Sequence, residues 1–244
     1  MKAYEPDLAY IHDTGFTGFV RKAAPGLFGL LKRNGIRSGL VVDAGCGSGV
    51  WARELSDRGY DVLGIDISAP MIRLARQHAP TARFQVASFL SAELPPCHAV
   101  TCIGEVVNYA FDRASGAKGL ARFFRRVHDA LRPGGLFVFD IVEPGLVAGD
   151  QPQRRFLEGP DWVILLEVRE DRKRQILTRR IVSFRRTGKV YRRSEEVHRL
   201  HLYSRGALLT ELRRTGFEAQ AYDGYGRFRF APAHAALIAR KPAW

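Results

Sequence analysis

Nine residues decide the fold of this chain: VVDAGCGSG, numbers 41–49. The run begins in a short apolar stretch of β-branched character, which predicts a buried strand. Three alternate glycines follow, because the backbone must turn sharply there and let a ligand lie against the peptide groups without a Cβ in the way. The start of the next helix then offers free N–H groups to a polar or anionic part of that ligand. The segment therefore predicts a strand, a ligand-binding turn and a helix.

The sequence downstream repeats this alternation of strand and helix. A helix is predicted from Trp51 to a stop at Gly59, and Ser68 with Pro70 marks the N-cap and start of another. Continuous apolar strands separated by helices indicate a parallel sheet covered on both faces, because a strand buried on both sides cannot alternate polar and apolar residues. This pattern predicts a doubly wound, Rossmann-like α/β fold. The predicted strands are 40–43, 60–66, 84–86, 99–103 and 136–140, with an amphipathic helix at 120–131 before the last.

The pattern of charged and apolar residues changes after about residue 150. Between residues 162 and 202, charged and apolar residues alternate around a turn at 187–189, which predicts antiparallel strands. We interpret them as an inserted flap or an extension of the sheet, where substrate specificity or a dimer contact would be built. A helix at 205–214 and strands at 217–222 and 235–240 are predicted to close the chain.

The residues before the first strand show helical spacing of apolar side chains up to Asn34-Gly35. This spacing predicts one helix, or a pair interrupted at Pro25-Gly26. We therefore expect a single domain, residues 1–244. Its predicted parts are a helical cap (1–38), a cofactor-binding core (39–143), a β-rich insertion (150–203) and a closing helix with strands (204–244).

Composition narrows the class of protein. A chain of 244 residues that is 46% hydrophobic is long enough to bury one substantial core. No apolar run approaches the roughly 20 residues of a bilayer span, and the N-terminus carries acids, so we expect a cytoplasmic protein without membrane contact. The cysteines, Cys46, Cys97 and Cys102, are odd in number and lack CxxC spacing. They predict reduced, buried thiols and neither a disulfide framework nor a metal site.

The net charge of +13 invites a role in nucleic-acid binding, because a basic face attracts phosphate. Most of the basic residues are arginine, a skew that genome base composition alone can produce. We therefore expect nucleic acid to be a possible but less favoured partner.

The nature of the ligand depends on Asp43. The glycines alone are ambiguous, since residues 47–52 also satisfy the GxGxxA pattern of dinucleotide-binding folds. Asp66, about 20 residues on, would accept ribose hydroxyl groups in either fold. A carboxylate directly before the turn, however, suits an ammonium or sulfonium ligand and would repel a pyrophosphate. Asp43 therefore favours a cationic ligand over a dinucleotide.

Three stretches together carry a family resemblance: VVDAGCGSG, then VLGIDIS at 62–68, then LRPGGLFVFD at 131–140. The sequence resembles the class I S-adenosylmethionine-dependent methyltransferases over residues 40–143, with a closing pair of strands after Gly216. The resemblance implies a seven-stranded sheet whose last strand is antiparallel. It also implies S-adenosylmethionine as cofactor, S-adenosylhomocysteine as product, and no metal.

The same resemblance suggests where the cofactor lies. Residues 45–47 would line its methionine part, and Asp66 with Ile67 its ribose and adenine. Ser88 stands where relatives usually carry an Asp that meets the adenine amino group. The segment 4–21 resembles the helical cap that closes the site. The predicted cofactor contacts are Asp43, Gly45, Cys46, Gly47, Gly49, Asp66, Ile67, Ser88, Phe89, Gly104, Tyr10 and Arg21.

The loop after the fourth strand is the predicted acceptor site, because strand carboxyl ends face the ligand crevice in this fold. Glu105 could orient or deprotonate an amine or hydroxyl group, Asn108 could hold it, and Tyr109 could provide a ring wall. Methyl transfer is an in-line displacement, so alignment and exclusion of water matter more than a strong base. His12, His198 and His201 are further candidate bases.

The function expected from these residues is methyl transfer to a nitrogen or oxygen atom of a small molecule. An alternative is an RNA or protein methyltransferase that uses the arginines of residues 169–199 as a phosphate track. A further alternative is a nicotinamide oxidoreductase, if the GxGxxA register were the functional one. A homodimer is possible in each case.

Overall fold

The computed structural model describes residues 3–149 and 151–243. Its helices are α1 (Pro6–Gly15), α2 (Gly18–Arg33), α3 (Val50–Ser56), α4 (Ala69–His78), a single 3-10 turn η1 (Val106–Asn108), α5 (Ala117–Ala130) and α6 (Arg205–Arg214). Its strands are β1 (Gly39–Ala44), β2 (Tyr60–Asp66), β3 (Arg83–Val86), β4 (Cys97–Cys102), β5 (Leu131–Val142), β6 (Gln153–Gly159), β7 (Trp162–Asp171), β8 (Ile176–Thr187), β9 (Val190–His201), β10 (Glu218–Tyr222), β11 (Gly224–Tyr225), β12 (Phe228–Arg229) and β13 (His234–Arg240).

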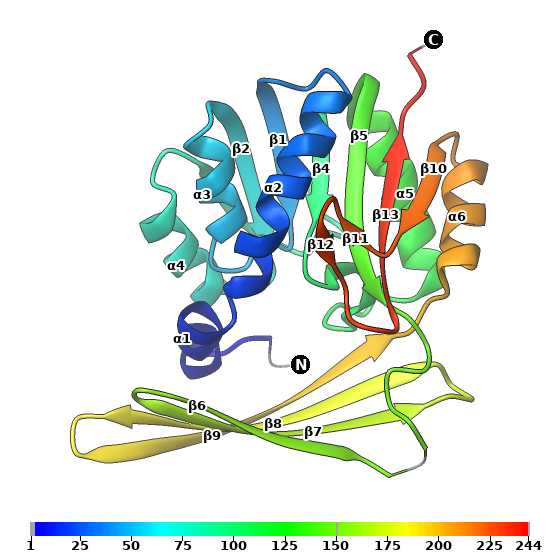
Figure 1. Cartoon of the computed structure of the whole chain (residues 1–244). Coiled ribbons are helices and arrows are strands. Elements are labelled where there is room, and N and C mark those ends of the chain that lie inside the picture. The colour runs from blue at the N-terminus through cyan, green and yellow to red at the C-terminus, as the bar shows by residue number, and fades with distance from the viewer. Residues whose placement is uncertain (1–2, 150, 244) are drawn as a thin grey trace.

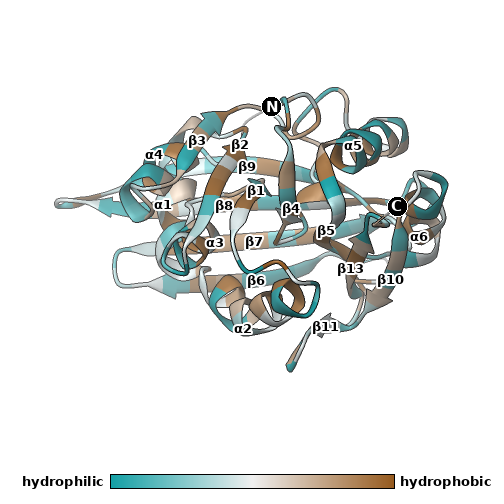
Figure 2. Ribbon diagram, turned by 90° about the horizontal axis from the view of Figure 1, so that it is seen from above, coloured by the Kyte–Doolittle hydropathy of each residue, from teal (hydrophilic) through white to brown (hydrophobic). Residues whose placement is uncertain are grey.

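A seven-stranded sheet forms the centre, in the order β10-β13-β5-β4-β1-β2-β3. β13 runs antiparallel to both of its neighbours, β5 and β10, and the remaining pairs of this sheet are parallel. Helices α2 and α3 pack on one face and α5 and α6 on the other, and Figure 2 shows α2 and α5 on opposite sides. The predicted doubly wound fold and its antiparallel last strand are therefore confirmed.

The predicted β-rich insertion is a separate antiparallel sheet, β6-β7-β8-β9. It lies below the carboxyl ends of the central strands (Figure 1). The predicted turn at residues 187–189 joins β8 to β9, and Gly188 adopts φ +65° there. Because side chains alternate between faces, one face of this sheet looks toward the central domain and the other away from it.

Two element boundaries differ from the prediction. The N-terminal helices are interrupted before Gly18, whereas α2 runs through Pro25 without a break. At Gly26 an added Cβ would lie 2.2 Å from the carbonyl oxygen of Tyr225, so this glycine allows β11 to approach the helix. The fifth strand starts at Leu131, which pairs with Cys97 before a shift in register, rather than at residue 136.

Two other local predictions, the cap at Ser68 and the buried thiols, are confirmed. Ser68 caps α4, because its hydroxyl oxygen accepts a hydrogen bond from the backbone N–H of Met71 at 3.2 Å. The three cysteines are free and buried. Within residues 3–149 and 151–243, no helix is both long and apolar enough to cross a membrane.

Candidate functional site

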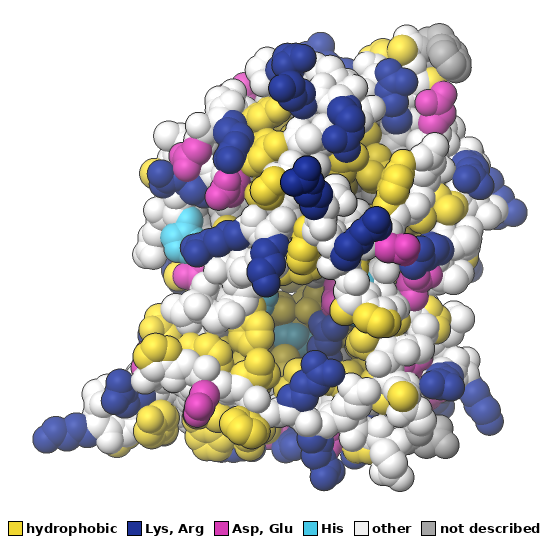
Figure 3. Space-filling model, viewed as in Figure 1, with side chains coloured by type: hydrophobic (Ala, Val, Ile, Leu, Met, Phe, Trp, Pro, Cys, Tyr) yellow, Lys and Arg dark blue, Asp and Glu magenta, His cyan; other side chains and the backbone are white. Residues whose placement is uncertain are grey.

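A cavity of about 730 Å³ lies between the carboxyl ends of the central strands and the inserted sheet. Figure 3 shows the hollow between the two layers, with Lys and Arg side chains on both sides of its opening. Its wall contains eleven residues from the sequence-predicted set: Asp43, Gly45, Cys46, Gly47, Asp66, Ile67, Ser88, Phe89, Gly104, Glu105 and Tyr109.

The three glycines of the first turn have different roles. All adopt positive φ values, +75° at Gly45, +53° at Gly47 and +80° at Gly49. A Cβ at Gly45 would collide with Val106, and one at Gly49 would collide with Ala75, so these two allow close packing. A Cβ at Gly47 would meet no atom within 4 Å among the residues described. Gly47 thus leaves open space at the cavity wall.

Asp43 ends β1 as a buried carboxyl group with one free oxygen. Its Oδ1 accepts a hydrogen bond from the Thr101 hydroxyl at 2.9 Å, while Oδ2 has no partner in the described part of the chain. Burial raises the pKa of Asp43 to about 7, against the opposing hydrogen bond from Thr101. An unpaired buried acceptor is costly, so a cationic or N–H donor ligand in the cavity would satisfy it.

Asp66 ties the end of β2 to the glycine turn. Its Oδ2 accepts a hydrogen bond from the backbone N–H of Gly47 at 2.9 Å, and its Oδ1 accepts one from the N–H of Ser68 at 2.8 Å. Burial raises the pKa of Asp66, although these N–H groups oppose the shift. A carboxylate can accept further bonds, so Asp66 keeps capacity for ligand hydroxyl groups.

The wall beside Asp66 is apolar with one hydroxyl group. Ile67 is 37% exposed, and Phe89 packs edge to face on Phe123 with ring centroids 4.9 Å apart. Ser88 accepts a hydrogen bond from the backbone N–H of Leu90 at 3.2 Å. This surface suits the face of a flat ring with a polar edge.

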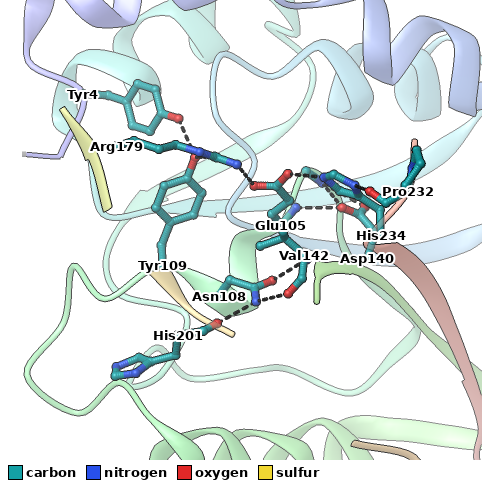
Figure 4. Close-up of polar contacts among 11 residues, drawn as sticks. Tyr4, Glu105, Asn108, Tyr109, Asp140, Val142, Arg179, His201, Pro232 and His234 are labelled. Atoms are coloured by element: carbon teal, nitrogen blue, oxygen red, sulfur yellow. Dashed lines mark hydrogen bonds and ion pairs between the residues drawn. The ribbon is translucent and has the colours of Figure 1, made fainter. Parts of the chain in front are cut away.

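Glu105 also lines the cavity and lies between Arg179 and His234 (Figure 4). Its Oε2 accepts a hydrogen bond from Arg179 at 2.8 Å, and its Oε1 lies 3.0 Å from Nε2 of His234. Burial would raise the pKa of Glu105, but the charge of Arg179 and the contact with His234 outweigh it and lower the pKa to about 2. A carboxylate held ionised in this way is a weak proton acceptor, so the geometry favours a positioning role.

Tyr109 belongs to an aromatic wall beside this ion pair. Its hydroxyl shares a hydrogen bond with that of Tyr4 at 3.0 Å and accepts one from Arg179 at 3.3 Å. Its ring stacks on Phe111 with centroids 4.8 Å apart. Tyr109 therefore presents a held hydroxyl group and an aromatic surface to the cavity.

Two histidines border the cavity close to Tyr4. His198 is buried with Nε2 2.9 Å from a carboxylate oxygen of Glu196, and its Nδ1 has no partner among the described residues. His12 also has an unpartnered Nδ1 there, and burial lowers its pKa to about 4. His201 instead contacts the Ser115 hydroxyl at 3.4 Å and does not line the cavity.

Four predicted site residues lie outside the cavity wall. Asn108 is fully buried and bonds to the backbone of Val142 and to the carbonyl of His201, so it braces the loop. Tyr10 donates to Asp161, and Arg21 is exposed on α2. Gly49 packs on α4 through Ala75.

Sequence reasoning missed Arg179 and His234. Arg179 had a signal, because it occupies an inward position of β8, in phase with the buried Leu177 and Ile181. A charged residue at an otherwise apolar phase of a strand indicates a buried partner. His234 carried no comparable signal, since only the pairing of β13 with β5 brings it to Glu105.

The family model and the curated relative that match this sequence are both described as methyltransferases. A family model described as a methyltransferase domain matches residues 41–135. The ubiquinone biosynthesis O-methyltransferase of Alkalilimnicola ehrlichii is 31% identical over 115 residues, which are 44% of this chain and 43% of that protein. The chain therefore spans less than half the length of this curated relative.

Solved structures match almost the whole chain. An S-adenosylmethionine-dependent methyltransferase from Clostridium acetobutylicum has a TM-score of 0.82 at 19% identity, covering 97% of this chain and 98% of its own. A sugar N-methyltransferase from Streptoalloteichus has a TM-score of 0.77 at 20% identity, covering 99% and 93%. At these identities the likeness shows the fold alone.

Proposed function

We propose that the chain is a class I S-adenosylmethionine-dependent methyltransferase that transfers a methyl group to a nitrogen or oxygen atom of a small molecule. One observation carries the proposal. The wall of a single cavity contains both the glycine turn with Asp43 and Asp66 and the Glu105–Arg179 pair with Tyr109. The methyl donor and the methyl acceptor would therefore bind in the same cavity.

The residues of the glycine turn and those beside it fit the cofactor. The free Oδ2 of Asp43 suits the ammonium group of the methionine part, and the space at Gly47 admits the ligand against the backbone. Asp66 would accept ribose hydroxyl groups, while Ile67 and Phe89 would contact the adenine ring. When bound, the cofactor supplies an electrophilic methyl group on a sulfonium.

Glu105, Tyr109 and Arg179 would align the acceptor. Arg179 holds both Glu105 and Tyr109, so these side chains have fixed positions before a substrate enters. The aromatic wall excludes water from the path of transfer. His12 is neutral at pH 7 with a pKa of about 4, so its unpartnered Nδ1 is a candidate to accept a hydrogen bond from the acceptor.

The arginines of the inserted sheet support a small acceptor over a polyanion track. Arg180 and Arg193 both pair with Glu195, and Arg169 pairs with Glu167. Charges neutralised within the chain offer less to a phosphate backbone. For this reason we favour the small molecule over RNA as the acceptor.

A thermal-shift titration tests the cofactor half of the proposal. S-adenosylhomocysteine should raise the melting temperature while NAD should not, because a ligand of the native state stabilises it by mass action. Incubation with S-adenosylmethionine labelled in its methyl group and a metabolite extract should then yield a labelled small molecule. A rise with NAD alone would overturn the assignment.

A further inference from the structure

Three arginines line the cavity: Arg155, Arg179 and Arg229. Glu105 pairs with only one of them, Arg179. Two other lining acids, Asp112 and Asp140, accept hydrogen bonds from backbone N–H groups, and Asp140 also accepts one from the Tyr225 hydroxyl.

Arg155 and Arg229 are the cations without a carboxylate partner among residues 3–149 and 151–243. Arg155 makes one long contact, 3.4 Å, to the side-chain oxygen of its neighbour Gln153, and Arg229 has no side-chain hydrogen bond in that part of the chain. By contrast Arg154, on the opposite face of β6, is held by Glu167 at 2.8 Å. Of these two neighbours on β6, the arginine without a carboxylate partner is therefore the one that lines the cavity.

These two arginines come from different parts of the fold. Arg155 stands on β6 in the inserted sheet, and Arg229 stands on β12, next to the central sheet. Figure 1 shows β12 above the inserted sheet, and Figure 3 shows basic side chains on both sides of the opening between them. A ligand that enters here passes between basic groups of both layers.

We propose that the methyl acceptor carries an oxyanion, a phosphate or a carboxylate, which Arg155 and Arg229 bind while the atom to be methylated lies deeper, near Tyr109. Guanidinium groups bind such oxyanions through two parallel N–H donors. Binding breaks no direct ion pair of these two side chains in the described part of the chain, although the charge of Arg229 also helps to lower the pKa of Asp223. The proposal rests on the proposed function and specifies the chemistry of its acceptor.

Anion titrations of the protein saturated with S-adenosylhomocysteine test this directly. Inorganic pyrophosphate and malonate, compared at constant ionic strength, represent the two sources of an oxyanion. At least one of them should raise the melting temperature of the unmodified chain. Arg155→Gln and Arg229→Gln should each weaken that anion's binding on the order of tenfold or more, as expected for hydrogen bonds to charged groups.

Arg154→Gln and Arg227→Gln are the matched controls. Each removes one positive charge from the same element or turn, but neither residue lines the cavity. The controls should bind the anion as the unmodified chain does. Equal weakening in all four variants would show a net-charge effect only and overturn the proposal, as would failure of both anions to bind.

The experiment distinguishes failure of the oxyanion proposal from failure of the proposed function. If S-adenosylhomocysteine binds all five proteins but neither anion does, only the oxyanion proposal fails. If S-adenosylhomocysteine itself does not bind, the proposed function fails first. A response to pyrophosphate but not malonate would identify the acceptor group as a phosphate, and the reverse as a carboxylate.

Discussion

Glu105 and Arg179 form an ion pair of 2.8 Å although 74 residues separate them. Glu105 follows the central strand β4, whereas Arg179 belongs to β8 of the inserted sheet. Their side chains are only 16% and 19% exposed, so each charge depends on the other for stabilisation. The pair thus fastens the insertion to the core at the point where the acceptor would bind.

Breaking this pair should destabilise the fold. Glu105→Gln and Arg179→Met should each lower the free energy of unfolding by about 3 kcal/mol, because each leaves a buried charge uncompensated. The double variant should lose less than the sum of the two. Urea unfolding of the four proteins measures the coupling, and additivity within about 0.5 kcal/mol would mean that the pair does not interact.

Arg180→Met is the control for this cycle. Arg180 pairs with Glu195 at 2.7 Å on the outer face, but its side chain is 49% exposed. Its loss should change the free energy of unfolding by no more than about 1 kcal/mol.

Asp43 should make the protein less stable as the pH rises. Its pKa is about 7 in the folded chain and near 3.8 when unfolded, so the folded state binds its proton more tightly. The stability that this proton supplies is present below about pH 4 and is lost as the pH rises through 7. A difference of about three units corresponds to on the order of 4 kcal/mol above pH 7.

Asp43→Asn should therefore melt at a higher temperature than the unmodified chain at pH 8, with a smaller difference at pH 5. The comparison is needed because burial also raises the pKa of Asp140, to about 6, and adds a slope of the same sign. Melting curves at both pH values measure the effect. Parallel pH profiles for the two proteins would contradict it.

Gly47→Val should abolish binding of S-adenosylhomocysteine while the fold persists. The valine side chain would extend into the open space at the cavity wall, where the ligand is expected. Calorimetric titration measures the loss, and circular dichroism checks the fold.

Gly59→Val separates that effect from backbone strain. Gly59 also has a positive φ, +81°, and open space around an added Cβ, but it lies in the turn before β2, away from the cavity. Both variants carry the same kind of strain, of roughly 1–2 kcal/mol. Loss of binding in both would show that strain, and not obstruction, is the cause.

Asp66→Ala should weaken binding of S-adenosylhomocysteine on the order of 100-fold or more, because it removes a charged acceptor for two ribose hydroxyl groups. It also frees the N–H groups of Gly47 and Ser68, so the turn should loosen. Asp66→Asn should lose less, since the amide oxygen still accepts a bond. Titration calorimetry that found normal affinity in Asp66→Ala would place the ribose elsewhere.

Sequence patterns were sufficient to predict the central sheet and its first turn. Apolar runs, glycines at positive φ and the cap at Ser68 are determined by neighbours within a few residues, and such local signals persist in the folded chain. The same local reasoning failed at Pro25, because what continues α2 there is a contact with β11, about 200 residues later.

The contacts within the acceptor site could be identified only from the tertiary structure. Loop position suggested Glu105, Asn108 and Tyr109 equally. In the folded chain, however, Asn108 braces β5 through hydrogen bonds, and Glu105 contacts Arg179 and His234. His234 is 129 residues from Glu105 in sequence. The sequence by itself determined the parallel core and its ligand turn, since these follow from periodicity and backbone freedom over short distances. Only the folded chain decided which charges meet across the cavity, because pairing of distant strands, and no local pattern, brings them together.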